Sequence, residues 1–215
     1  MNSNIEHIQD YWDKRYQAEG KVWGEAPSRT AQYALKLFRQ AGVKRVLVPG
    51  SGYGRNTKLF SSSGFYVTGI EVSRVAFDLA RKFDPRSEFF NTSALDMSFF
   101  DNEYDAIYCF NVLHLFREKD RLRLISQCKK HLNKKGMMFF TVFSEKEPSY
   151  GEGAEIEKDT FESRPGRPAH YFSEEDLKAH FAKFTLIETG LMEDPEEHGG
   201  KPHVHVLRYI CVRTR

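Results

Sequence analysis

The stretch VLVPGSGYGRNT, residues 46–57, is a short apolar run that ends in three alternating glycines. An apolar run of this length is typical of a strand that is buried on both faces. Glycines directly after such a strand let the backbone approach a ligand closely, and a helix that follows points free N–H groups toward it. The stretch therefore predicts a strand, a ligand-binding loop and a helix, in that order.

Strand-like and helix-like segments alternate along the chain from Arg45 onward. Runs rich in β-branched and aromatic residues occur at 45–49, 66–70, 88–91, 104–110 and 137–143, with helix-like segments between them. Ser73 is a candidate N-cap for one of these helices. The alternation predicts an α/β fold with a doubly wound, Rossmann-like sheet that is mostly parallel.

The last part of the chain follows a different pattern. After a helix predicted at 173–184, the runs TLIETGL and HVHVLRYICVR are joined by the polar segment MEDPEEHGGKP, with no helix between them. Strands joined in this way form an antiparallel hairpin. We therefore expect a seven-stranded sheet with a C-terminal antiparallel hairpin, in a single domain of residues 1–215. Residues 1–40 form a helical, aromatic cap on the core of residues 41–215.

Composition narrows the class of protein. The 215 residues are 40% hydrophobic and 29% charged, with a net charge of +2, which suits a globular protein. Runs of five or six like charges and long apolar stretches are both absent from the sequence, so we expect no nucleic-acid partner and no membrane partner. Cys109, Cys128 and Cys211 are widely spaced and odd in number, which favours buried reduced thiols and a cytoplasmic location. Monomer and homodimer are both left open.

Three polar residues follow successive strands and suit a nucleoside. Glu71 ends the second strand, where an acid accepts hydrogen bonds from ribose hydroxyls. Asp96 follows the third strand and is suited to bind an adenine amino group, and Asn111 stands at the carboxyl end of the fourth strand. The loop reads G-x-G-x-G rather than the G-x-G-x-x-G of dinucleotide sites, and few residues remain for a second half-sheet. The pattern favours S-adenosylmethionine (SAM) as cofactor, with an NAD(P)-dependent oxidoreductase as the alternative.

The glycine loop, Glu71, Asp96, YDAIYCFNVLHLF and the closing hairpin together resemble the class I SAM-dependent methyltransferases, from about residue 10 to the end. YWDKRYQAEGKVWGEAPS followed by VLVPGSGYGRNT is similar to the thiopurine, thiol and tellurite-resistance branch. The sequence departs from the wider family at Val48, where an acid is common. The resemblance implies an enzyme that transfers a methyl group from SAM to a small-molecule acceptor such as a thiol, a chalcogen or another soft nucleophile.

The same resemblance implies a set of cofactor-binding residues, with Trp23 and Tyr16 closing over the site. The predicted cofactor-binding residues are Gly50, Ser51, Gly52, Gly54, Asn56, Glu71, Asp96, Met97, Asn111 and Trp23.

Candidate residues for the acceptor side come from topology. A strand that runs antiparallel to the others begins on the cofactor side, so KPHVHV places His203 and His205 there, on one face because strand side chains alternate. His114, just after the fourth strand, is the third candidate catalytic residue. Further candidates at the same rim are Tyr150, His170 and Tyr171.

The histidines allow one further alternative. His198, His203 and His205 could supply three imidazoles to a metal ion, or could bond the hairpin structurally. The sequence forces no carboxylate or thiolate to join them, and methyl transfer from a sulfonium needs no metal, so we expect no metal site. A non-catalytic module that binds SAM or a metal is a further alternative to the methyltransferase. The glutamate-rich segment 145–158 is expected to be a solvated loop or an active-site cover.

Overall fold

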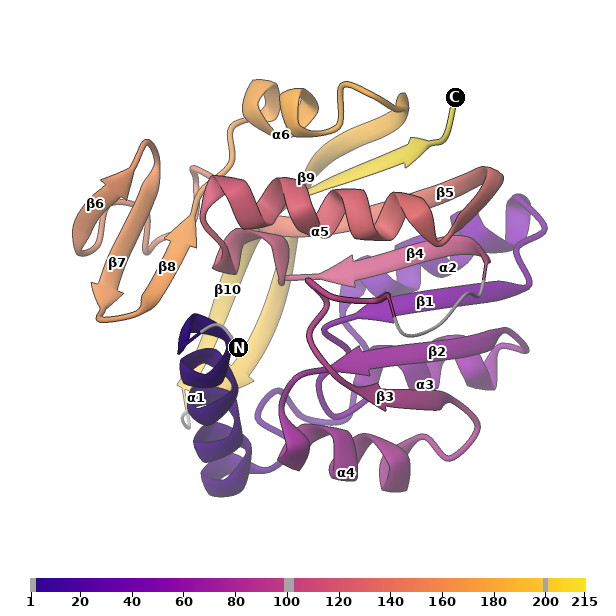
Figure 1. Ribbon diagram of the computed structural model, residues 1–215, viewed down its shortest axis with the longest axis horizontal. Helices are drawn as coiled ribbons and strands as arrows, with labels where there is room; N and C mark the ends of the chain where they lie inside the picture. Colours follow the sequence, from indigo (N-terminus) through magenta and orange to yellow (C-terminus); the bar gives the residue numbers. More distant parts are fainter. Residues whose placement is uncertain (1–2, 99–102, 199–200) are drawn as a thin grey trace.

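The computed structural model describes residues 3–98, 103–198 and 201–215, and its seven-stranded sheet carries helices on both faces (Figure 1). The strand order is β3-β2-β1-β4-β5-β10-β9, with β1 to β5 parallel and β10 antiparallel to both of its neighbours. The predicted fold class is therefore confirmed. The strands are β1 (Arg45–Pro49), β2 (Tyr66–Glu71), β3 (Glu88–Asn91), β4 (Tyr104–Phe110), β5 (Leu132–Phe143), β9 (Thr185–His198) and β10 (Lys201–Arg213).

The two faces of the sheet are buried by different helices. Val46 and Val48 of β1 pack in one apolar cluster with Phe38 of α2 (Arg29–Gln40) and Phe60 of α3 (Arg55–Ser62). Leu47 points the other way, into a cluster with residues of α5 (Glu118–Lys130) and α6 (Glu174–His180). Burial on both faces is the reason that β1 reads as an uninterrupted apolar run.

The N-terminal helix α1 (Ser3–Glu19) lies beside α4 (Arg74–Phe83) at the end of the sheet (Figure 1). Ser73 is the N-cap of α4, as predicted, and its hydroxyl accepts a hydrogen bond from the N–H of Ala76. Asp13 of α1 accepts hydrogen bonds from Ser73 Oγ over 2.5 Å and from Val75 N over 3.1 Å. A carboxylate is stabilised at a helix N-terminus, so Asp13 fastens α1 to the core.

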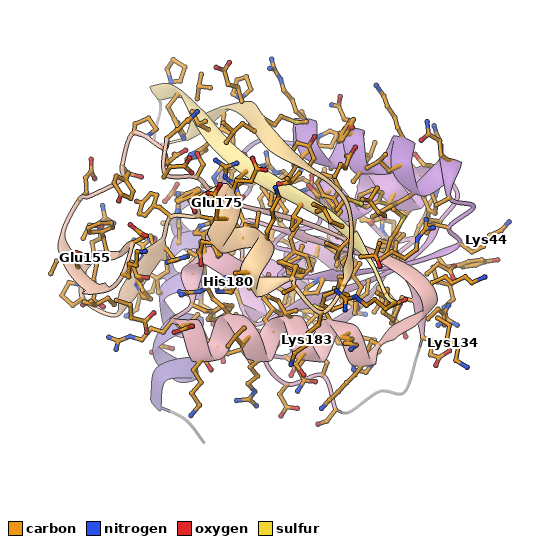
Figure 2. All side chains as sticks on the ribbon, turned by 90° about the horizontal axis from the view of Figure 1, so that it is seen from above. Lys44, Lys134, Glu155, Glu175, His180 and Lys183 are labelled. Atoms are coloured by element: carbon orange, nitrogen blue, oxygen red, sulfur yellow. The ribbon has the colours of Figure 1, made fainter. Side chains whose placement is uncertain are left out.

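A second, three-stranded antiparallel sheet follows β5. It consists of β6 (Ala154–Glu157), β7 (Thr160–Arg164) and β8 (Arg167–His170). The prediction of a solvated loop at 145–158 is therefore wrong from residue 154 onward, where β6 begins. Figure 2 places Glu155 of β6 at the opposite end of the molecule from Lys44, which precedes β1, and from Lys134, near the start of β5. The small sheet therefore stands at the carboxyl edge of the parallel strands.

The closing hairpin is longer than the sequence predicts. Residues 192–198, expected to be part of a polar loop, belong to β9 and pair with β10. The ladder between β10 and β5 ends at the pair Leu207 and Phe143, so residues 201–206 continue beyond the carboxyl end of β5. This register carries His203 and His205 to the edge where the sequence placed them.

Three smaller findings complete the fold. The three cysteines are free and buried. Among the helices that the structure describes, none combines the length and the apolar character needed to cross a membrane. A short 3-10 helix, η1 (Leu113–Leu115), follows β4 and carries His114.

Candidate cofactor and acceptor site

A cavity of about 370 Å³ lies at the carboxyl edge of the parallel strands. Its wall is formed by α1, the glycine loop, the residues after β4 and β5, the small sheet and the β9–β10 hairpin. This volume falls in the range of small-molecule sites, about 300–1,000 Å³. Wall residues from the predicted sets are Gly50, Ser51, Gly52, Asn56, Glu71, Asn111, His114, His205, Tyr16, Tyr171 and Trp23.

The glycine loop has the backbone conformation that only glycine adopts easily. Gly50, Gly52 and Gly54 have φ values of 66°, 55° and 90°. A Cβ on Gly50 would lie 2.3 Å from Cγ2 of Val112, so a side chain there requires movement of the wall. Gly54 does not line the cavity but is the N-cap of α3, and no side chain caps that helix. An uncapped helix N-terminus suits an anionic group such as a carboxylate.

Glu71 holds the loop from the end of β2. Its Oε2 accepts a hydrogen bond of 2.8 Å from Gly52 N, and its Oε1 accepts one of 2.8 Å from Ser73 N. Burial raises the pKa of this carboxyl to about 7, although the backbone N–H donors oppose the increase and the nearby charge of Asp13 adds to it. A buried carboxylate facing the cavity beside a glycine loop is suited to accept hydrogen bonds from vicinal hydroxyls.

Asp96 and Met97 do not line the cavity, in contrast to the position that the sequence suggested for them. A turn closed by the hydrogen bond from Asp96 N to the carbonyl of Ser93 directs Asp96 outward, where its carboxylate accepts a hydrogen bond from Ser98 Oγ over 2.7 Å. The apolar side chain of Met97 is fully buried in the core. The wall at this point consists of Ser93, Ala94 and Leu95. The sequence pattern favoured the acid at this position, because Ser93, Ala94 and Leu95 are small or apolar and do not indicate a binding role.

Asn111 lines the cavity at the carboxyl end of β4, as predicted. Its φ of 53° is uncommon for a residue other than glycine. Thr141 of β5 fixes this conformation, because its carbonyl accepts from Asn111 N over 3.1 Å and its hydroxyl donates to Asn111 Oδ1 over 3.1 Å.

Two predicted polar residues line the loop side of the cavity. Asn56 is held by its Oδ1, which accepts a hydrogen bond of 3.0 Å from Ser28 N. The buried Oγ of Ser51 has no hydrogen-bond partner within the described part of the chain. A buried hydroxyl without a partner is costly unless a ligand satisfies it, so the wall fits a polar ligand such as SAM.

An aromatic cluster covers the glycine loop. The ring of Trp23 stacks on that of Tyr53 with centroids 6.3 Å apart, and Trp12 and Tyr16 pack around the pair. Trp23 N donates to the hydroxyl of Tyr53, which in turn donates to the carbonyl of Gly24 over 2.6 Å. The cluster joins α1 and the segment after it to the loop and shields this side of the cavity from water.

His114 is 1% exposed and lines the cavity. Its ring stacks on Phe143 with centroids 3.9 Å apart and planes inclined by 15°. Burial lowers the pKa of His114 to about 3, with the charges of His205 and His170 adding to the decrease. Among the described residues its Nδ1 has no hydrogen-bond partner, so a neutral imidazole presents an unsatisfied polar atom.

The hairpin histidines meet two carboxylates that sequence reasoning missed. Nε2 of His203 lies 2.7 Å from Nε2 of His205, and Nδ1 of His205 lies 2.5 Å from Oε1 of Glu147. Glu196 Oε2 stands 3.6 Å from His205 Nε2. His205 and Glu196 line the cavity, whereas His203, which was predicted to line it as well, does not. Strand alternation across a longer hairpin would have paired Glu196 with His203, but the segment was read as a loop. The side chain of His198 lies outside the described residues.

Two of the further candidates are not at the cavity. His170 is buried between Thr160 Oγ1, at 2.8 Å, and Asp176 Oδ2, at 2.7 Å, and does not line the wall. Tyr150 is exposed and donates to Asp159. Tyr171 does line the cavity and donates to Ser149 Oγ over 2.8 Å.

Comparisons with known proteins agree with this architecture. Residues 46–136 match the family model described as a methyltransferase domain. A Geobacillus sp. (strain WCH70) protein named as a methyltransferase is 27% identical over 58% of this chain and 54% of its own length. The glycine/sarcosine N-methyltransferase of Halorhodospira halochloris is 26% identical over 59% of this chain and 46% of its own. The chain thus spans about half the length of the curated relatives it matches.

Solved structures share the fold. The Burkholderia thailandensis 1,6-didemethyltoxoflavin-N1-methyltransferase, solved with S-adenosylhomocysteine (SAH), has a TM-score of 0.72 at 20% identity, covering 100% of this chain and 91% of its own. TehB from Haemophilus influenzae has a TM-score of 0.66 at 17% identity, covering 96% of this chain and 67% of its own. The fold is therefore that of the SAM-dependent methyltransferases. The antiparallel β10 also distinguishes this sheet from the parallel 3-2-1-4-5-6 sheet of the dinucleotide enzymes.

Proposed function

We propose that this protein is a SAM-dependent methyltransferase that acts on a small molecule bound in the cavity. One observation carries the proposal: the glycine loop with Glu71 lines the same cavity as His114 and His205. A cofactor held at the loop and an acceptor held beside the histidines would meet inside this cavity. The match of residues 46–136 to a methyltransferase domain supports the same conclusion.

On the cofactor wall, each group has a proposed task. Glu71 accepts hydrogen bonds from the ribose hydroxyls, and the uncapped start of α3 faces the amino-acid carboxylate. Asn56, Asn111 and the Ser51 hydroxyl offer further polar contacts. Bound SAM would supply an electrophilic methyl group on its sulfonium.

The residues on the acceptor wall position the nucleophile and exclude water, which is most of what a methyl displacement requires of a protein. His114 remains neutral, since burial keeps its pKa near 3, and offers a hydrogen bond rather than a charge. His205 and Glu196 complete this wall, and His203 contacts His205 through Nε2. A thiolate or chalcogen anion needs no base, whereas an amine or phenol acceptor benefits from one.

We propose a soft nucleophile, a thiol or a chalcogen anion, as the acceptor. Support comes from the similarity of the N-terminal aromatic segment and the PGSG loop to the thiopurine, thiol and tellurite-resistance branch. The toxoflavin and glycine/sarcosine enzymes methylate nitrogen by their names, so amines belong in the same experiment.

Calorimetric titration with SAM and SAH tests the cofactor, and a screen of acceptors that detects SAH formation tests the activity. The screen includes small thiols, selenite, tellurite, phenols and amines. We expect binding of both nucleosides and SAH release with at least one thiol or chalcogen. Glu71→Ala is expected to weaken SAH binding roughly tenfold or more, as loss of hydrogen bonds to a charged acceptor does, while Glu88→Ala, at the exposed start of β3, leaves it unchanged. A protein that binds neither nucleoside contradicts the proposal.

A further inference from the structure

Four ionisable side chains share one face of the β9–β10 hairpin. The register pairs His203 with Glu196 and His205 with Asp194. Residues two apart on a strand point to the same side, so both histidines and both acids face the same way. The ligand atoms of Glu196, His203 and His205 all lie within 4.8 Å of one another.

The two imidazoles approach each other by the nitrogens that bind metals. Nε2 of His203 and Nε2 of His205 are 2.7 Å apart. At this distance one nitrogen donates a hydrogen bond to the lone pair of the other, and a metal ion bound by both nitrogens would replace the proton between them. The carboxylate of Glu147, 2.5 Å from Nδ1 of His205, accepts the proton of that nitrogen. It thereby favours the tautomer in which Nε2 of His205 carries the lone pair that can coordinate a metal.

The carboxylate of Glu196 is held in a similar way. Its Oε1 forms a short ion pair with Arg55, whose guanidinium also donates to the carbonyl of Trp23 over 3.1 Å. Its Oε2 is the oxygen that faces His205, 3.6 Å from Nε2. Metal ligands in proteins are commonly fixed by outer partners of this kind, a carboxylate behind a histidine and a donor behind a carboxylate.

Three carboxylates with little exposure gather around the cluster. Glu147 and Asp194 are 5% and 3% exposed, and the Glu196 side chain is 4% exposed. Among the described residues, Arg55 is the guanidinium that contacts one of these three carboxylates, and Oδ2 of Asp194 has no hydrogen-bond partner. Buried carboxylates are costly unless they are paired or coordinate a metal. A bound cation would offset negative charge at this cluster.

We propose that Glu196, His203 and His205 bind a divalent transition-metal ion, for which Zn²⁺ is the probe. Two histidines and one glutamate form a ligand set that occurs in zinc sites with an open fourth position. Because Glu196 and His205 line the cavity, the open position would face the acceptor. A thiol bound there would lose its proton to solvent and remain as the thiolate. This role in acceptor binding rests on the proposed function, whereas metal binding does not. The expectation of no metal site depended on the lack of a carboxylate, and Glu196 supplies one.

Metal binding can be measured on the full chain, free of any histidine tag and stripped with a chelator. Titration with Zn²⁺ by calorimetry, and with Co²⁺ by its visible d–d absorption, is expected to give one ion per chain and to raise the melting temperature. Glu196→Gln and His203→Ala are each expected to weaken the affinity by roughly tenfold or more. The control is His180→Gln, which changes a histidine that contacts Asp176 on α6, away from the cavity; it should bind the metal as the unaltered chain does.

The outcomes separate this proposal from the function. Weak or non-stoichiometric binding, or stoichiometric binding that persists in the Glu196→Gln/His203→Ala double variant, overturns the metal site. Circular dichroism and melting curves verify that each variant is folded, and Glu196→Gln alone decides the matter if His203→Ala is unfolded. SAH titration is run in parallel on the same samples. SAH binding without metal binding rejects only the metal site, and metal binding without SAH binding rejects only the methyltransferase.

Discussion

The backbone N–H of Gly52 donates a hydrogen bond of 2.8 Å to the carboxylate of Glu71, which is 6% exposed. The loop that would hold the cofactor and the acid that would hold its ribose are therefore joined before any ligand arrives. This contact also places an ionisable group where burial raises its pKa to about 7, from an ordinary value of 4.5.

The raised pKa of Glu71 makes stability depend on pH. Between the two pKa values the folded chain binds a proton that the unfolded chain does not, so the free energy of unfolding falls as pH rises through about 7. Between about pH 4.5 and pH 8, we expect the free energy of unfolding of the unaltered chain to fall by at most about 3 kcal/mol more than that of the Glu71→Gln variant. Urea unfolding of both proteins across this pH range measures this difference. Parallel pH profiles for the two proteins would refute the shift.

His114 is expected to remain neutral throughout the range in which histidines usually titrate. Its pKa, lowered from 6.5 to about 3 by burial, means that its ring resonances do not move between about pH 5 and pH 8 in NMR spectra. His114→Gln identifies the resonances. The unfolded chain takes up a proton at this position below about 6.5, so His114 also reduces stability as pH falls from 6.5 toward 3. Titration of the His114 ring near pH 6 would contradict this assignment.

Gly50 combines a left-handed conformation with a crowded site. Its φ is 66° and an added Cβ would stand 2.3 Å from Val112, whereas Gly64, with φ 91°, has no atom within 4 Å of its Cβ position. We expect Gly64→Ala to cost about 1–2 kcal/mol for conformation alone, and Gly50→Ala to cost more because overpacking adds about 1–3 kcal/mol. Thermal unfolding measures both. Equal losses of stability in the two variants would mean that the side chain of Val112 moves aside without an energetic cost.

Both tryptophans of the chain line the cavity, so fluorescence should report ligand binding. Saturation with SAH is expected to change the emission of the protein, and Trp23→Phe to remove most of the change because Trp23 stacks on Tyr53 of the glycine loop. Trp12→Phe, which leaves this stack in place, is the matched variant. An emission spectrum that is insensitive to saturating SAH would place the ligand away from the aromatic cluster.

Sequence patterns predicted the parts of the site that depend on local order. The loop from Gly50 to Gly54 follows a buried strand, and Glu71 and Asn111 end strands, so their common edge followed from parallel topology. The pattern did not predict the positions of Asp96 and Met97, which do not line the cavity. A single turn decides which residues after β3 face the cavity, and the sequence does not reveal this turn.

The residues that the sequence did not reveal lie in segments whose structure depends on distant partners. Residues 154–170 contain glutamates, glycines and few apolar runs, and they become strands only by pairing with one another. Glu147 and Glu196 come near His205 through a turn after β5 and through the register of a long hairpin. Neither contact has a fixed sequence spacing, so no sequence motif predicts the contacts of Glu147 and Glu196 with His205.

The position of β10 has a consequence for how the molecule is assembled. The strand is inserted between β5 and β9, and its pair Leu207 and Phe143 joins residues far apart in the chain. The loop and strands of residues 45–111 pair among themselves, whereas the wall with His205 exists only after the C-terminal strand β10 has docked. Contacts of such long sequence separation form slowly. A chain that stops before residue 201 would keep the donor half of the site, lose its acceptor half, and leave β5 as an open sheet edge that can pair with other chains.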